Sequence, residues 1–213
     1  MPKILTPDEV LRFRDRMCDH ALATFAKHGV EGITLRGLAA DLSCSRTTPY
    51  RYFKDKADIL AALRKREFGR LADAQEATLK QETEPRKQLV ALASTYLQFA
   101  IKEPDTYRVM YQVVQQNPSQ YTELATEILR SGEPIRRVVQ ASVSAGIMHG
   151  DPTNIGYMLW AGLHGLIALH LADLLGDERE IEELATVMIR SLGRAVSTEP
   201  SKTAAARRTS KKL

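Results

Sequence analysis

Residues 29–63 read GVEGITLRGLAADLSCSRTTPYRYFKDKADILAAL, and the fold prediction starts from this stretch. Thr34 is a typical helix N-cap, and apolar residues follow it at helical spacing as far as Leu42. Residues 43–45 interrupt the pattern, and a second short helix is expected over residues 46–53, with the last residue of the break as its N-cap. Two short helices joined by a three-residue turn predict a helix-turn-helix.

The second helix of this pair begins with hydroxyl and guanidinium groups. Such groups reach base edges or phosphates when the N-terminal end of the helix enters the major groove. The N-termini of the neighbouring helices are also suited to phosphate contacts. The predicted DNA-contacting residues are Thr34, Ser45, Arg46, Thr47, Thr48, Tyr50, Arg51, Tyr52, Lys54 and Lys56. Any pair of short helices with a polar face has the same spacing, so a purely structural role stays open at this point.

The stretch resembles the DNA-binding domain of TetR-type bacterial repressors. The family pattern reads Phe-Ala-x-x-Gly, then Thr-x-x-x-Leu-Ala, then Ser-x-x-Thr-x-Tyr-x-Tyr-Phe, then Lys-x-x-x-Leu. In this chain the positions are filled by Phe25, Ala26, Gly29, Thr34, Leu38, Ala39, Ser45, Thr48, Tyr50, Tyr52, Phe53, Lys56 and Leu60. The resemblance covers the chain up to about Leu63 and implies an all-α regulator.

Two positions depart from the family pattern. The turn usually holds Gly-Val, whereas this chain has Ser43 and Cys44. Position 49 is usually a large apolar residue, whereas here it is Pro49. Because proline lacks the amide that donates a helical hydrogen bond, Pro49 leaves open where the second helix starts and which side chains point at bases.

Charge is distributed unevenly along the chain. Residues 1–80 carry 15 Lys/Arg and 11 Asp/Glu, residues 81–196 carry 10 and 14, and residues 197–213 carry 5 and 1. A basic N-terminal segment ahead of an acidic body favours a polyanionic partner such as DNA. Residues 197–213 hold no large apolar residue before Leu213, so we expect a disordered basic tail.

The remaining pattern is helical, with no sustained period-two alternation. We expect nine helices in a TetR-like architecture. The predicted parts are a helix-turn-helix DNA-binding domain over residues 1–56, a connecting helix over 57–80, a ligand-binding and dimerisation domain over 81–196 and the tail. The first helix should begin with a capping box from Thr6 to Glu9 and end at Gly29. The last two helices are expected from Pro152 to about Leu175 and from about Glu178 to Val196.

Residues 152–172 carry no formal charge, a length that raises the question of a membrane span. His164, His170 and the acidic flanks argue against one. A helix that is apolar all round is otherwise buried on several sides, in a core or at an oligomer interface. We therefore predict no membrane partner.

The family resemblance implies that residues 81–196 bind a small-molecule effector and form a homodimer. The last two helices, numbers 8 and 9 of the prediction, are the expected dimer pair because Gly156, Gly162 and Gly165 allow close backbone approach. A ligand pocket is lined by apolar and aromatic groups with a few polar ones. The candidates are Tyr96, Phe99, Tyr107, Met110, Tyr111, Trp160 and His164, and plain core packing is the alternative role for each.

Trp160-Ala-Gly-Leu-His164-Gly165 resembles the tryptophan–histidine–glycine signature of one subgroup of TetR-type C-terminal domains. The sequence contains no metal-ligand spacing among its histidines and no CxxC, so we predict neither a metal nor another cofactor. Two cysteines and no apolar leader in MPKILTPDEV indicate a cytoplasmic protein. An enzyme using His164 with Asp173 is disfavoured because no nucleophile–base pair accompanies them.

These patterns together predict a sequence-specific DNA-binding transcriptional regulator, a ligand-released repressor that acts as a homodimer on a palindromic operator. The alternative is a helical protein–protein adaptor that retains the fold without specific DNA reading. The polar start of the second short helix favours the regulator.

Overall fold

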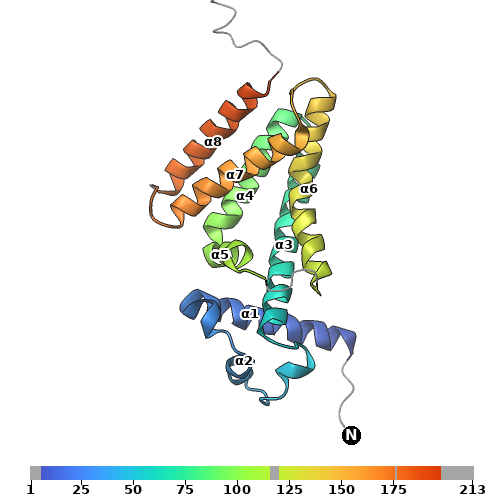
Figure 1. Ribbon diagram of the computed structural model, residues 1–213, viewed down its shortest axis with the longest axis vertical. Coiled ribbons are helices and arrows are strands. Elements are labelled where there is room, and N and C mark those ends of the chain that lie inside the picture. Colours follow the sequence, from blue (N-terminus) through green and yellow to red (C-terminus); the bar gives the residue numbers. More distant parts are fainter. Residues whose placement is uncertain (1–5, 116–119, 176, 198–213) are drawn as a thin grey trace, which may run out of the picture. The chain divides into compact units, whose positions relative to one another are not determined.

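The computed structural model describes residues 6–115, 120–175 and 177–197, and these are almost entirely helical (Figure 1). The elements are α1 (Pro7–Gly32), α2 (Leu35–Asp41), the 3-10 helix η1 (Pro49–Arg51), α3 (Lys56–Gln81), α4 (Pro85–Lys102), α5 (Pro104–Gln112), α6 (Thr122–Ser144), α7 (Pro152–His170) and α8 (Glu178–Ala195). The all-α prediction is confirmed. The expected tail over residues 197–213 lies outside the described residues, except for Ser197.

The chain forms two compact units. Unit 1 consists of residues 1–71 and 103–131, and unit 2 consists of residues 72–102 and 132–213. The helices α3 and α6 each contribute residues to both units.

The predicted helix starts are present as hydrogen bonds. The Glu9 amide donates to Thr6 Oγ1 at 3.2 Å, and the Thr6 amide donates back to Glu9 Oε2 at 2.9 Å, which completes the capping box. Thr34 caps α2, and Asp151 caps α7 by accepting from the Asn154 amide at 2.8 Å. Local sequence therefore determines where these helices begin.

Helix ends agree less closely with the prediction. Gly29 has φ +64°, the left-handed conformation expected there, but one further turn follows it before α1 ends at Gly32. The helix α7 ends at His170 rather than near Leu175, because the chain turns after it and Asp173 adopts φ +55°. Eight α-helices are described rather than nine, since the expected helix over residues 46–53 is replaced by the short η1.

Unit 1 is built around an apolar core to which α1, α2, α3 and α5 all contribute. The core side chains that are almost fully buried include Met17, Ala21, Ile33, Leu38, Phe53, Ile59, Leu63 and Val109. The helix α1 packs against α2 and α5, and α2 packs against η1. The core thereby fixes the helix-turn-helix elements relative to α1.

Unit 2 is held together by the mutual packing of α4, α7 and α8. Buried aliphatic residues recur at helical spacing on α7 and α8, namely Ile155, Leu159, Leu163, Ile167, Ile181, Ala185 and Ile189. A Cβ atom at Gly162 would clash with the sulfur of Met188, so the end of that side chain on α8 packs directly against the α7 backbone and would have to shift if residue 162 had a side chain.

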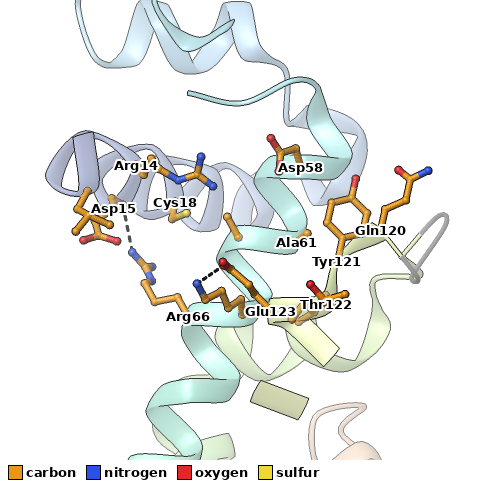
Figure 2. Close-up of a pocket in the computed structure, with 14 residues that line it drawn as sticks. Arg14, Asp15, Cys18, Asp58, Ala61, Arg66, Gln120, Tyr121, Thr122 and Glu123 are labelled. Carbon is orange, nitrogen blue, oxygen red and sulfur yellow. Dashed lines mark hydrogen bonds and ion pairs between the residues drawn. The ribbon is translucent and has the colours of Figure 1, made fainter. Parts of the chain in front are cut away.

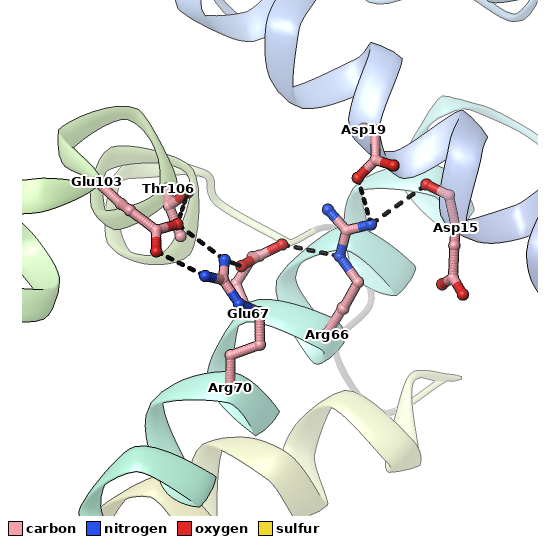
Figure 3. A network of polar contacts seen from close by, with 7 residues as sticks. All are labelled: Asp15, Asp19, Arg66, Glu67, Arg70, Glu103 and Thr106. Atoms are coloured by element: carbon pink, nitrogen blue, oxygen red, sulfur yellow. Dashed lines mark hydrogen bonds and ion pairs between the residues drawn. The ribbon is translucent and has the colours of Figure 1, made fainter.

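A network of charged side chains crosses unit 1 around Glu67, which is fully buried (Figure 3). Arg66 Nε donates to one Glu67 carboxylate oxygen at 2.8 Å, and Arg70 Nη1 donates to the other at 2.6 Å. Arg66 also bonds to Asp19 of α1 at 2.7 Å, and Arg70 forms a two-pronged pair with Glu103 at the start of α5. The network thus ties α1 and α5 to α3.

These bonds also shift proton affinities. The hydrogen bonds that Glu103 accepts from Arg70 hold the pKa of its carboxyl below the usual glutamate range. The carboxylate therefore stays ionised, and the pair persists, at pH values where an ordinary glutamate begins to protonate.

We expect Arg66→Ala to lower the free energy of unfolding by about 3 kcal/mol, because Glu67 would remain buried with only one of its two cationic partners. Chemical denaturation at neutral pH measures this. Arg12→Ala is the matched control, since its pair with Asp8 is exposed at both ends and is worth about 0.5 kcal/mol. Equal effects of the two substitutions would contradict the importance of the buried network.

Candidate nucleic-acid interface

The turn after α2 takes the shape that the helix-turn-helix pattern predicts. Ser43 adopts φ +50°, the left-handed conformation in which the family pattern usually has glycine. The amides of Ser43 and Cys44 donate to the carbonyls of Ala40 and Ala39, both at 2.9 Å. The turn therefore satisfies its own backbone groups without glycine and redirects the chain at residue 44.

Residues 45–53, which we call the recognition segment, form a series of tight turns rather than the predicted α-helix. Amides at 48, 51 and 52 each donate to the carbonyl three residues earlier, at 2.9–3.1 Å. Pro49 has no amide to donate, so the regular bond to Ser45 is missing and only η1 is recognised as helical. The prediction of a helix over residues 46–53 is therefore wrong, and the proline is the physical reason.

The recognition segment nevertheless has an inner and an outer face. Pro49 and Phe53 are buried on the inner face, Phe53 with 1% exposure. Arg46, Thr47, Tyr50 and Arg51 are exposed, and these four side chains are called the outer face below. Four of the ten predicted DNA-contacting residues are thus accessible to solvent on either side of the buried Pro49.

The other predicted contacts differ in exposure and in bonding. Ser45 and Lys54 are exposed, whereas Thr48, Tyr52 and Lys56 are half-buried. The Thr34 hydroxyl is exposed but accepts the Gly37 amide at 3.0 Å. Lys56 Nζ lies 3.4 Å from Glu31 Oε2 in a pair whose acid is almost fully exposed. An anionic partner can therefore compete with Glu31 for Lys56.

Two α1 side chains contact the recognition segment and were not predicted from sequence. The ring of Phe13 lies 4.3 Å from that of Tyr52. Arg14 Nη1 donates to the Tyr52 carbonyl at 2.5 Å, and its guanidinium lies 4.2 Å from the centre of the Phe53 ring. The partners are 38 residues apart in sequence, so no local pattern signals these contacts.

The predicted effector residues divide between the two units. In unit 2, Trp160 Nε1 donates to the Tyr96 hydroxyl at 3.1 Å, and that hydroxyl lies 3.5 Å from His164 Nδ1. Phe99 is half-buried in the same unit. In unit 1, Tyr107 and Met110 are buried and Tyr111 is half-buried. The Tyr107 and Tyr111 rings are 4.7 Å apart. The ligand assignment stays a prediction for all seven.

A cavity of about 440 Å³ lies in unit 1, lined by side chains from α1, from α3 and from residues 120–124 (Figure 2). Arg14 and Cys18 of α1 and Asp58 of α3 are among its lining residues, and Lys65 on α3 pairs with Glu123 at 2.5 Å. Burial raises the pKa of the Cys18 thiol to about 11, so it is protonated at neutral pH. The predicted effector residues are not among those lining this cavity.

The described residues contain no cluster of three or more His, Cys, Asp or Glu side chains placed to hold a metal ion. None of the described helices combines the length and the hydropathy needed to cross a bilayer, including the uncharged α7.

Burial lowers the pKa of the His164 imidazole below its ordinary value of 6.5. Trp160 is the chain's one tryptophan, and its ring lies 5.5 Å from that of His164. Because a protonated imidazole quenches a neighbouring indole, we expect Trp160 fluorescence to fall with a midpoint below pH 6.5. The unfolded chain binds this proton first as the pH falls, so stability also decreases there.

A fluorescence titration of the native protein checks this, with His164→Gln as the control that should lose the transition. A midpoint at or above pH 6.5, or a transition that survives the substitution, would show that His164 is not the group involved.

Two families match the chain by sequence. Residues 18–63 match the family described as "Bacterial regulatory proteins, tetR family", and residues 89–192 match "Tetracyclin repressor-like, C-terminal domain". A comparison with curated proteins finds no match. The first range includes the whole helix-turn-helix, and the second runs from within α4 to within α8.

Several solved structures share the fold. A protein of unknown function from a Rhodococcus species is 26% identical, with a TM-score of 0.75 over 87% of this chain and 95% of its own. The TetR family regulator PfmR of Thermus thermophilus is 20% identical, with a TM-score of 0.67 over 87% of this chain and 100% of its own. FadR of Bacillus subtilis, solved in complex with stearoyl-CoA, is 16% identical, with a TM-score of 0.72 over 85% and 98%.

Proposed function

The chain belongs to the TetR family of bacterial regulatory proteins, and from that membership we propose that it is a ligand-released repressor acting as a homodimer on a palindromic operator. It is a DNA-binding transcriptional regulator, and the family is not enzymatic. The observation that carries the proposal is the outer face of the recognition segment, where Arg46, Thr47, Tyr50 and Arg51 are exposed together above the buried Pro49 and Phe53.

We assign the reading of bases to Arg46 and its exposed neighbours, and contacts with phosphates to residues at the edges of the segment. Arg46 carries two forked donors suited to the edge of a guanine. Lys56 stands at the first position of α3, where a helix N-terminus also favours a phosphate. Direct contacts at the centre and phosphate contacts at the rim are the usual division of roles in such interfaces.

Dimerisation through α7 and α8 would pair two recognition segments. The helix α7 has no formal charge, yet it exposes Tyr157, Met158 and Trp160, with Tyr157 64% exposed. On α8, Leu184 and Val187 are exposed on a different face from the buried Ile181 and Ala185. Large exposed apolar side chains on adjacent helices are typical of a contact surface. Two segments about 34–36 Å apart would read successive major grooves of a palindrome.

The proposed effector site is the hydrogen-bonded group of Tyr96, Trp160 and His164. It combines aromatic surface with a hydroxyl and an imidazole, so it suits a small molecule with an apolar body and one hydrogen-bonding group. Such a molecule releases DNA only if it binds the DNA-free conformation more tightly, because equal binding to both conformations shifts nothing.

A mobility-shift titration with the DNA upstream of the chain's own gene tests this function. We expect binding to the operator to exceed binding to random DNA of equal length by about a thousandfold or more. Sedimentation of the complex should give an even number of protomers per operator. Equal affinity for all sequences, or no DNA binding, would overturn the proposal, and the second result would support a protein–protein adaptor.

We expect Arg46→Ala to weaken operator binding by about 1–3 kcal/mol and to relax the sequence preference at one base position, because a forked base contact would be lost. Binding to a library of operators with single-base changes measures both effects. Unchanged affinity and unchanged preference would rule out base reading by Arg46.

We expect Lys56→Ala to weaken binding to all sequences alike and to reduce the slope of log K against log salt by about one, since one phosphate contact would be lost. Salt titrations on operator and random DNA measure this. A loss confined to particular operator bases would contradict the phosphate role.

A further inference from the structure

The recognition segment has little backbone structure of its own. Each of its described backbone hydrogen bonds closes a single turn. The Tyr52 and Phe53 amides share one acceptor, the Pro49 carbonyl, at 2.9 and 3.0 Å. A helix that is interrupted at a proline and limited to one 3-10 turn gains little from cooperative propagation. The orientation of the segment must therefore come from contacts with the rest of unit 1.

Two side chains of α1 contact the C-terminal end of the segment, at Tyr52 and Phe53. Carbonyl groups in the last turn of a helix have no partner within the helix, and cationic side chains stabilise them. Arg14 of α1 meets this need, because its Nη1 atom donates to the Tyr52 carbonyl at 2.5 Å. The same guanidinium covers the Phe53 ring, with 4.2 Å between Cζ and the ring centre.

Arg14 is placed to act on orientation rather than on charge alone. It is half-buried, and its described hydrogen bond and ring contact are to a backbone carbonyl and an aromatic face. The hydrogen bond from Lys65 lowers the pKa of Glu123, and the charge of Arg14 adds to this without a described hydrogen bond to that carboxylate. One guanidinium serves both partners at once, because it donates a hydrogen bond to the carbonyl while its charge lies over the aromatic ring. The ring of Phe13, the preceding residue on α1, packs against the Tyr52 ring at 4.3 Å and adds a second contact at the same residue of the segment.

We propose that Arg14 is the positioning residue that fixes the DNA-reading face of this protein, by capping the Tyr52 carbonyl and stacking on Phe53 from α1. The inference rests on the proposed DNA reading by the recognition segment. Arg14 thereby adds a hydrogen bond from α1 at the C-terminal end of a segment whose regular helical bonding Pro49 interrupts. It acts through the segment and not through a contact with DNA.

Amide hydrogen exchange in the DNA-free protein tests whether Arg14 stabilises the turn at Tyr52 and Phe53. In Arg14→Ala we expect the Tyr52 and Phe53 amides to exchange about tenfold faster, because the turn that they close loses its cap. Amides of α7 in unit 2 should keep their rates. Unchanged rates at Tyr52 and Phe53 would overturn the proposal, whatever the protein does with DNA.

Binding measurements separate positioning from a phosphate contact. We expect Arg14→Ala to lower the ratio of operator affinity to random-DNA affinity by about tenfold while leaving the salt slope unchanged. A slope reduced by about one, with equal losses on both DNAs, would show a direct phosphate contact and contradict the inference. A lower melting temperature with an unchanged ratio would show a merely structural role and contradict it equally.

Two further variants complete the test. Arg14→Lys keeps the charge and a donor but loses the planar stacking, so it should recover part of the affinity ratio. Arg12→Ala removes the same charge from the same helix, and its described partner is the exposed Asp8, so the ratio should be that of the unsubstituted protein. If the unsubstituted protein shows no operator preference, the proposed function is wrong. The exchange experiment then still tests whether Arg14 stabilises the turn at Tyr52 and Phe53.

Discussion

The burial of Phe53 at the end of the recognition segment is the constraint on which the DNA-binding part of this protein depends. With 1% exposure, the ring belongs to the same core as Met17, Leu38 and Leu63. Burying a phenylalanine is worth about 1.5–3 kcal/mol, which exceeds what a single 3-10 turn supplies by its own hydrogen bonds. With Phe53 and Pro49 buried, Tyr50 and Arg51 between them and Arg46 and Thr47 before them are exposed, whereas Thr48 and Tyr52 are half-buried.

The buried Glu67 is a second constraint on unit 1, and it acts through charge rather than through apolar surface. A carboxylate without exposure is tolerated because Arg66 and Arg70 each donate to one of its oxygens. Both arginines have a second acidic partner, on α1 and at the start of α5. Leaving any buried member of such a network unpaired costs free energy. The network therefore favours the arrangement of α1, α3 and α5 that pairs all of them over other packings that would bury a similar apolar area.

In unit 2, apolar residues divide into those used inside the chain and those left at its surface. Ile181 and Ala185 of α8 are buried, whereas Leu184 and Val187 are exposed. Sequence periodicity marks all four as helical and apolar, but it does not separate core from contact surface. The three glycines of α7 show a similar limit of sequence analysis: their small size predicts close approach at Gly156, Gly162 and Gly165 alike, but among them only Gly162 has a neighbour this close within the described residues, Met188 of its own chain.

The sequence by itself determined the helical class, the caps at Thr6, Thr34 and Asp151, and the first helix and turn of the helix-turn-helix, because each depends on residues within a few positions of one another. Tertiary structure decided the conformation of residues 46–53. There Pro49 removes one helical hydrogen bond, so helix propensity alone does not decide the conformation. Contacts from Phe13 and Arg14, which are distant in sequence, hold the segment instead. Local interactions can be read from spacing, whereas contacts between distant residues exist only after the core has formed.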